Sequence, residues 1–112
     1  MEIIKCKLTY QGAGRKPALR ISKADRQKYF SKDERRIIVE IDGTEFYTTL
    51  TNDFFEHVGQ IRTLYEKPNA ITINMLEEWV AKNKLNVGDE IYLEVIEAKK
   101  RFRLLKSIQS KV

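Results

Sequence analysis

The stretch LEEWVAKNKLNVGDEIYLEVIE, residues 76–97, decides the fold because it joins a helix to a strand through a short turn. Leu76, Trp79 and Val80 are three and four positions apart, so their side chains share one face of a helix. Asn74 precedes them as an N-cap, because its short polar side chain can accept a hydrogen bond from the first turn. This half predicts a short amphipathic helix packed on a core.

The other half of the stretch predicts a turn and a strand. NVGDEI, residues 86–91, contains Gly88 and Asp89, residue types that favour tight turns after a helix. Apolar and polar side chains then alternate over residues 91–96, the period of two that is typical of a half-buried strand. A return strand follows through Phe102, Leu104 and Ile108.

The clearest element of the sequence is a hairpin within RRIIVEIDGTEFYTTL, residues 35–50. An apolar run at residues 37–41 leads into Asp42 and Gly43, a pair that suits a two-residue hairpin turn because both accept a positive φ. Phe46, Tyr47 and Leu50 supply the return strand.

The first thirty residues predict two strands and a helix. MEIIKCKLTY, residues 1–10, has a period near two, and ALRIS, residues 18–22, forms a second strand beyond a glycine-containing loop. Ser22 is placed to cap a helix over residues 22–30, and Asp25 favours the positive end of that helix.

Residues 51–70 lack a regular period. We expect a connecting arm there, followed by a short strand from Ile61 to Tyr65, with Phe54 and Phe55 in the core or on a self-association surface. The whole chain, 1–112, is then a single domain: mainly β, with seven mostly antiparallel strands in an open pseudobarrel and two short helices closing its ends.

Composition limits the class of protein. The chain has 112 residues, a net charge of +5 and 42% hydrophobic residues, which predicts one compact domain that favours polyanionic partners. No apolar run reaches the roughly 18 residues of a membrane helix, so no membrane partner is expected. The single cysteine, Cys6, agrees with a reducing compartment, and we expect a cytoplasmic protein.

The sequence contains little that points to catalysis. One cysteine and one histidine do not make a metal site, and His57 lies in the irregular arm, where a solvated or capping role is the ordinary one. The glycines at residues 12–14 match no phosphate-loop or dinucleotide motif. We therefore expect no enzyme activity and no cofactor.

Basic residues gather in the first part of the chain. No acidic residue lies between Ile3 and Ala24. Six basic residues crowd the span from the first loop through the first helix: Arg15, Lys16, Arg20, Lys23, Arg26 and Lys28. Such residues can contact phosphates, and amide or guanidinium groups can donate to purine edges. The same residues also fit a scattered charged surface that keeps a small barrel in solution. The second basic run, residues 98–103, fits a solvated hairpin turn.

The order of these parts resembles the B3-like DNA-binding pseudobarrel of plant B3 transcription factors and of the DNA-recognition domains of EcoRII-type and BfiI-type restriction endonucleases. LRISKADRQKYF, residues 19–30, is similar to the family's strand and helix, and WVAKNKLNVGDEIYLEV, residues 79–95, is similar to its helix, Gly-Asp turn and strand. The hairpin of residues 37–50 lies between them. AbrB-like swapped-hairpin proteins share the Gly-Asp turn, so the likeness depends on the whole order, over residues 2–105.

The resemblance implies sequence-specific binding of double-stranded DNA through two arms that enter the major groove. It implies a transcriptional regulator, or the recognition or effector module of a restriction-modification system in which a separate nuclease chain or domain cleaves. The alternative is a protein-interaction β-barrel with no nucleic-acid partner. The two arms would contain Gln11, Gly12, Gly14, Arg15, Lys16, Arg20 and Lys23, and then Thr49, Thr51, Asn52, Asp53, Gln60 and Arg62.

Overall fold

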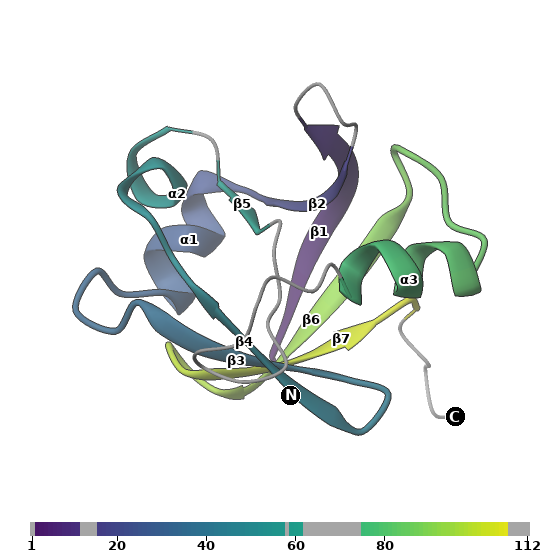
Figure 1. Cartoon of the computed structure of the whole chain (residues 1–112). Helices are drawn as coiled ribbons and strands as arrows, with labels where there is room; N and C mark the ends of the chain where they lie inside the picture. The colour runs from purple at the N-terminus through teal and green to yellow at the C-terminus, as the bar shows by residue number, and fades with distance from the viewer. Residues whose placement is uncertain (1, 12–15, 58, 62–74, 108–112) are drawn as a thin grey trace.

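The fold is one seven-stranded sheet, seen in a computed structural model that describes residues 2–11, 16–57, 59–61 and 75–107. The strands lie in the order β4-β3-β7-β6-β1-β2-β5 and curl into a half-barrel (Figure 1), which confirms the mainly β fold. The strands are β1 (Glu2–Gln11), β2 (Lys16–Ile21), β3 (Arg36–Ile41), β4 (Thr44–Thr49), β5 (Gln60–Ile61), β6 (Glu90–Glu97) and β7 (Arg101–Leu105). The helices are α1 (Lys23–Tyr29), α2 (Asn52–Glu56) and α3 (Met75–Lys82).

The predicted hairpin is confirmed as β3 and β4. Asp42 and Gly43 have φ values of 50° and 85°, so the turn has positive φ at both central positions. Ile37 and Val39 on β3 and Phe46 on β4 turn their side chains into the core. The pairing therefore buries one apolar face of the predicted hairpin.

The turn between α3 and β6 is also confirmed. The Asn86 amide donates to Asp89 Oδ2 at 2.7 Å, and Gly88 has a φ of 95°. The Gly88 amide donates to the Leu8 carbonyl at 2.8 Å, and the Leu8 amide donates to the Asp89 carbonyl at 2.9 Å. The turn thus binds β1 before β6 begins, which fixes where β6 enters the sheet. Leu85 packs half-buried on the core.

One continuous core fills the inside of the half-barrel. Phe102 is fully buried on β7, and its ring stacks on Phe30 with centroids 4.8 Å apart. Leu76, Trp79 and Val80 bury the predicted face of α3; its expected cap, Asn74, lies outside the described residues. No helix in the described part of the chain is long and apolar enough to span a membrane.

Cys6 belongs to this core, as a small residue on the inner face of β1 that is 2% exposed. Burial, and secondarily the negative charge of Asp25, raise the pKa of the Cys6 thiol to about 12. The thiol is therefore neutral and shielded in the folded protein.

The segment after the hairpin differs from the prediction. The expected connecting arm contains a third helix, α2, whose Thr51 hydroxyl accepts a hydrogen bond from the Phe54 amide at 3.3 Å. Phe54 is 2% exposed and packs edge-on against Phe30, so it belongs to the core. The next strand is Gln60–Ile61, earlier and shorter than expected; residues 62–65 lie outside the described residues.

Candidate functional site

The first predicted arm is described only in part. Gly12, Gly14 and Arg15 lie outside the described residues, as does Arg62 of the second arm. Gln11 and Lys16 lie opposite each other where β1 ends and β2 begins. Arg20 lies further along β2 with an exposed side chain, and exposed Lys23 begins α1, capped by Ser22 whose Oγ accepts from the Asp25 amide at 3.3 Å.

The second predicted arm divides between the two ends of α2. Thr49 ends β4, the Thr51 hydroxyl is used in the helix cap, and Asn52 and Asp53 form the exposed first turn of α2. Gln60 lies beyond the other end of α2, on β5 opposite Arg20. The structure therefore brings Arg20, Lys23 and Gln60 to one region and leaves the threonines, Asn52 and Asp53 away from it.

The region around Arg20 is a groove of about 390 Å³ between the outer face of the sheet, the start of α1 and the residues after α2. We call it the cationic groove. Its charged lining residues are Lys5, Lys7, Arg20, Lys23, Arg26 and Glu90, and the exposed His57 lies at its edge beside Gly59.

Strand register aligns four polar side chains on the outer face of the sheet; three of them line the cationic groove, and the fourth, Gln60, is half-buried beside Arg20. Lys7 on β1 lies opposite Glu90 on β6 and opposite Arg20 on β2, and Arg20 lies opposite Gln60 on β5. Lys7 and Arg20 are thus direct cross-strand neighbours with the same charge, an arrangement that destabilises a sheet.

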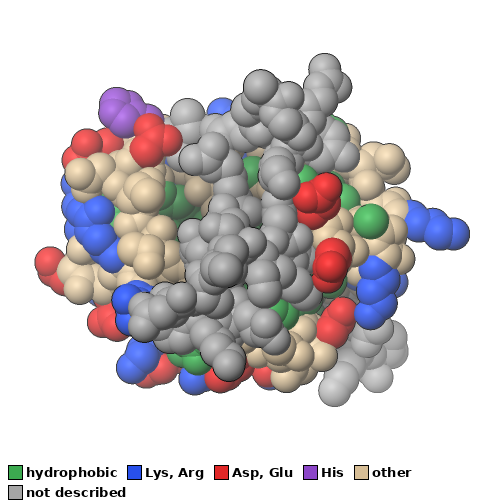
Figure 2. Space-filling model, viewed as in Figure 1, with side chains coloured by type: hydrophobic (Ala, Val, Ile, Leu, Met, Phe, Trp, Pro, Cys, Tyr) green, Lys and Arg blue, Asp and Glu red, His purple; other side chains and the backbone are tan. Residues whose placement is uncertain are grey.

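The outer face of the other half of the sheet shows the opposite pattern. Arg103 on β7 bonds to Glu40 on β3 and to Glu94 on β6, the latter at 3.2 Å. Arg101 pairs with Glu45 on β4. Glu40 and Glu45 are also like-charged cross-strand neighbours, but each of them is paired with an arginine. Figure 2 shows basic and acidic side chains interspersed along the left and lower margins of the molecule.

Glu90, the carboxylate of the cationic groove, is already engaged. Its Oε2 accepts a hydrogen bond from the Tyr92 hydroxyl at 3.0 Å, which raises the pKa of Tyr92, and its Oε1 lies 4.0 Å from Lys5 Nζ. Within the described ranges, no carboxylate lies at ion-pair distance from the other exposed cations of the groove. These cations are Lys7, Arg20 and Lys23.

Arg26 forms the floor of the cationic groove and also holds α2. Its side chain leaves α1, is 9% exposed, and donates from Nη1 to the Phe54 carbonyl at 2.6 Å, at the negative end of α2. It lies flat on Gly59, where an added Cβ would come within 2.7 Å of Arg26 Cζ. The Gly59 carbonyl in turn accepts from the Ile21 amide at 2.8 Å, so the floor is fixed to β2.

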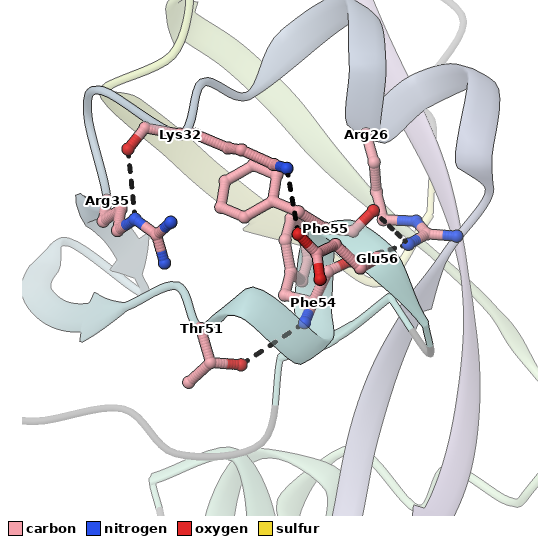
Figure 3. A network of polar contacts seen from close by, with 7 residues as sticks. All are labelled: Arg26, Lys32, Arg35, Thr51, Phe54, Phe55 and Glu56. Atoms are coloured by element: carbon pink, nitrogen blue, oxygen red, sulfur yellow. Dashed lines mark hydrogen bonds and ion pairs between the residues drawn. The ribbon is translucent and has the colours of Figure 1, made fainter.

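Further contacts fix α2 against the chain around α1, as Figure 3 shows. Lys32 Nζ lies 3.2 Å from Glu56 Oε1, and the Arg35 guanidinium lies over the Phe55 ring at 5.5 Å from its centroid. The carbonyl of Lys32 accepts from Arg35 Nε at 3.1 Å. The last turn of α2 is therefore contacted by Arg26 from α1 and by Lys32 and Arg35 from the segment that follows α1.

The sequence contained a signal for some of the residues that the prediction missed. Lys5 and Lys7 alternate with buried Ile4 and Leu8, so the period of β1 already places both lysines on the outer face. Arg26 belongs to the same basic stretch as Arg20 and Lys23, but nothing local indicated its contact with the Phe54 carbonyl, because Phe54 is 28 positions away.

Comparison with known proteins gives a family. Residues 1–111 match the model of the Family of unknown function (DUF7112). The chain belongs to this family. No curated protein and no solved structure matches the chain. The function of this DUF7112 chain must therefore be inferred from the cationic groove itself.

Gly59→Ala should disturb the floor of the groove in the DUF7112 chain. The φ of Gly59 lies outside the left-handed region, so alanine fits the backbone but collides with Arg26. We expect the free energy of unfolding to fall by about 1.5–3 kcal/mol, the range for a lost hydrogen bond to a charged group. Urea unfolding of the variant measures this loss.

A double-mutant cycle supplies the control. In an Arg26→Ala background the obstructing side chain is gone, so adding Gly59→Ala should change stability by less than about 0.5 kcal/mol. Equal losses in both backgrounds would contradict the packing of Arg26 on Gly59.

Proposed function

We propose that the protein binds double-stranded DNA through the cationic groove. The observation that carries the proposal is the direct cross-strand placement of Lys7 and Arg20, with no carboxylate at ion-pair distance from either among the described residues. Glu90 lies opposite Lys7, but its oxygens face Tyr92 and Lys5. Like charges placed side by side are unfavourable in the free protein. A polyanion in the groove would turn this repulsion into attraction.

The geometry also supports an extended ligand. Lys7 and Arg20 lie on the sheet and Lys23 begins α1, so their cations come from three elements around one concavity. Phosphate contacts of this kind position a duplex. Gln60, opposite Arg20, is half-buried with its Oε1 shielded, so it is less open to a base edge than the three cations are to phosphates.

The protein-interaction alternative is less well supported. It requires an exposed aromatic surface on the arm, whereas Phe54 is core and Phe55 is half-buried against Phe54 and Arg35. We also propose a separate nuclease partner, as in a restriction-modification system, which the family resemblance implies, and a cytoplasmic location, which the single cysteine supports.

A selection from randomised duplexes at about 50 and 200 mM salt tests the proposal. We expect an enriched sequence, and binding of that duplex should weaken with a log–log salt slope of about −1.8 or steeper, about −0.9 for each of two phosphate contacts, one at Lys7 and Arg20 and one at Lys23. The same duplex with its sequence shuffled is the control for specificity. Absence of duplex binding at low salt would contradict the proposal and favour the protein-interaction barrel.

A further inference from the structure

The cationic groove contains a smaller feature that DNA binding alone does not explain. A flat basic surface would suffice for a duplex backbone, but here Lys7 and Arg20 stand beside a floor made by Arg26, whose side chain is about nine-tenths buried. Burying a guanidinium requires partners for its donors.

Arg26 is only partly satisfied by the protein. Its Nη1 donates to the Phe54 carbonyl at 2.6 Å and lies 3.5 Å from the carbonyls of Phe55 and His57. Its Nε is buried and makes no hydrogen bond within the part of the chain that the structure describes. Its Nη2 also donates no hydrogen bond to a described residue. Figure 3 shows the guanidinium with one terminal nitrogen turned to Phe54 and the other turned away from α2.

Gly59 makes room for this floor. A side chain at position 59 would occupy the space where the Arg26 guanidinium lies, so glycine lets the planar group rest on the backbone. The fork of an arginine matches two oxygens of a phosphate, and arginine is more weakly hydrated than lysine. Arg20 and Lys7 add two positive charges beside it.

We infer that the floor of the cationic groove is a phosphate subsite in which Arg26 couples the bound phosphate to the position of α2. This deepens the proposed function, on which it rests, by assigning one phosphate to Arg26, Arg20 and Lys7. The phosphate group belongs either to a duplex backbone or to a free phosphorylated compound. A guanidinium fixed by phosphate on one side holds the Phe54 carbonyl, and so the last turn of α2, on the other. Arg26 is in this respect a positioning residue for α2.

Amide NMR of the ¹⁵N-labelled full chain tests this inference with inorganic phosphate as the probe and chloride at equal ionic strength as the control. We expect saturable shifts at Arg20, Ser22 and Gly59 with phosphate alone. The amide of His57, which donates to the Asp53 carbonyl at 2.9 Å in α2, should exchange about tenfold more slowly at saturation. Identical responses to chloride, or no saturable shift, would overturn the inference.

Variants separate the charge of Arg26 from its geometry. Arg26→Lys keeps the charge and loses the fork, so phosphate affinity should fall about tenfold and the slowing of His57 exchange should disappear. A response equal to that of the unmodified protein would overturn the coupling. Arg20→Gln is a second variant, at an exposed position, for the case that Arg26→Lys does not fold. It should lower phosphate affinity and leave the exchange rate of the His57 amide in the free protein unchanged. Lys100→Gln in the distant β6–β7 turn should change neither.

A duplex titration distinguishes this inference from the proposed function. Displacement of phosphate by the selected duplex supports both and assigns the phosphate to the duplex backbone. Duplex binding without any phosphate response would overturn the subsite and leave the proposed function standing. Phosphate binding without duplex binding would overturn the proposed function and support a subsite for a free phosphorylated compound.

Discussion

Replacing Arg20 by glutamate is expected to weaken duplex binding by at least about tenfold at low salt and to make the log–log salt slope less negative by about 0.9. Arg20 is exposed in the middle of the cationic groove, opposite Lys7 and beside Gln60. The new carboxylate would repel phosphate and neutralise Lys7. Fluorescence anisotropy of a labelled duplex over a range of salt concentrations measures both quantities.

The same substitution should not destabilise the fold. A carboxylate opposite Lys7 replaces a like-charge pair by an opposite-charge pair, so the free energy of unfolding should rise by about 0.2–1 kcal/mol. Loss of binding together with a gain in stability would show that the repulsion between Lys7 and Arg20 lowers stability but serves duplex binding. Urea unfolding measures this second effect.

Lys100→Glu is the matched control for Arg20→Glu. It makes the same change in net charge at the exposed β6–β7 turn, at the other end of β6 from Glu90. We expect a small loss of affinity from weaker long-range attraction. Equal losses in the two variants would mean that net charge, and not the cationic groove, determines binding.

Phe102→Ala should have the largest effect on stability. Phe102 is fully buried on β7, lies opposite Val39 of β3 and Val95 of β6, and stacks on Phe30 with an interplanar angle of 21°. We expect a loss of about 3–5 kcal/mol, the range for deleting a buried phenylalanine. Since whole domains are stable by about 5–15 kcal/mol, this variant is near the limit of folding.

Val87→Ala is the comparison for Phe102→Ala, because Val87 is 52% exposed and its truncation should cost less than about 0.5 kcal/mol. Urea unfolding with a fitted m-value serves both variants. A loss below about 1 kcal/mol for Phe102→Ala would contradict a core that is continuous from α1 to β7.

Much of the fold could be predicted from the sequence because its deciding signals are local. The Asp42 and Gly43 turn, the Ser22 cap and the Gly88 turn each depend on residues within a few positions of one another. Helix α2 was not predicted, because its five residues, Asn52–Glu56, are too few to show a helical period.

The candidate site could be predicted less well because it depends on pairings between distant segments. Arg20 and Lys23 were predicted from the clustering of basic residues. The placement of Lys7 beside Arg20 follows from the β1–β2 register, and the role of Arg26 follows from the docking of α2 on α1. Neither can be derived from composition or periodicity.

The order of strands in the sheet has a consequence for how the chain matures on the ribosome. Glu2 of β1 pairs with Val95 of β6, and β3 has β7 as its second neighbour. Strands β1 and β3 are made early in synthesis, but each lacks one neighbouring strand until residues 90–105 are made. Pairings between remote segments make folding slow, and strands awaiting a neighbour can associate with other nascent chains. The sheet is therefore incomplete until the β6–β7 hairpin is available, and we expect the chain to be most prone to association with other chains before that.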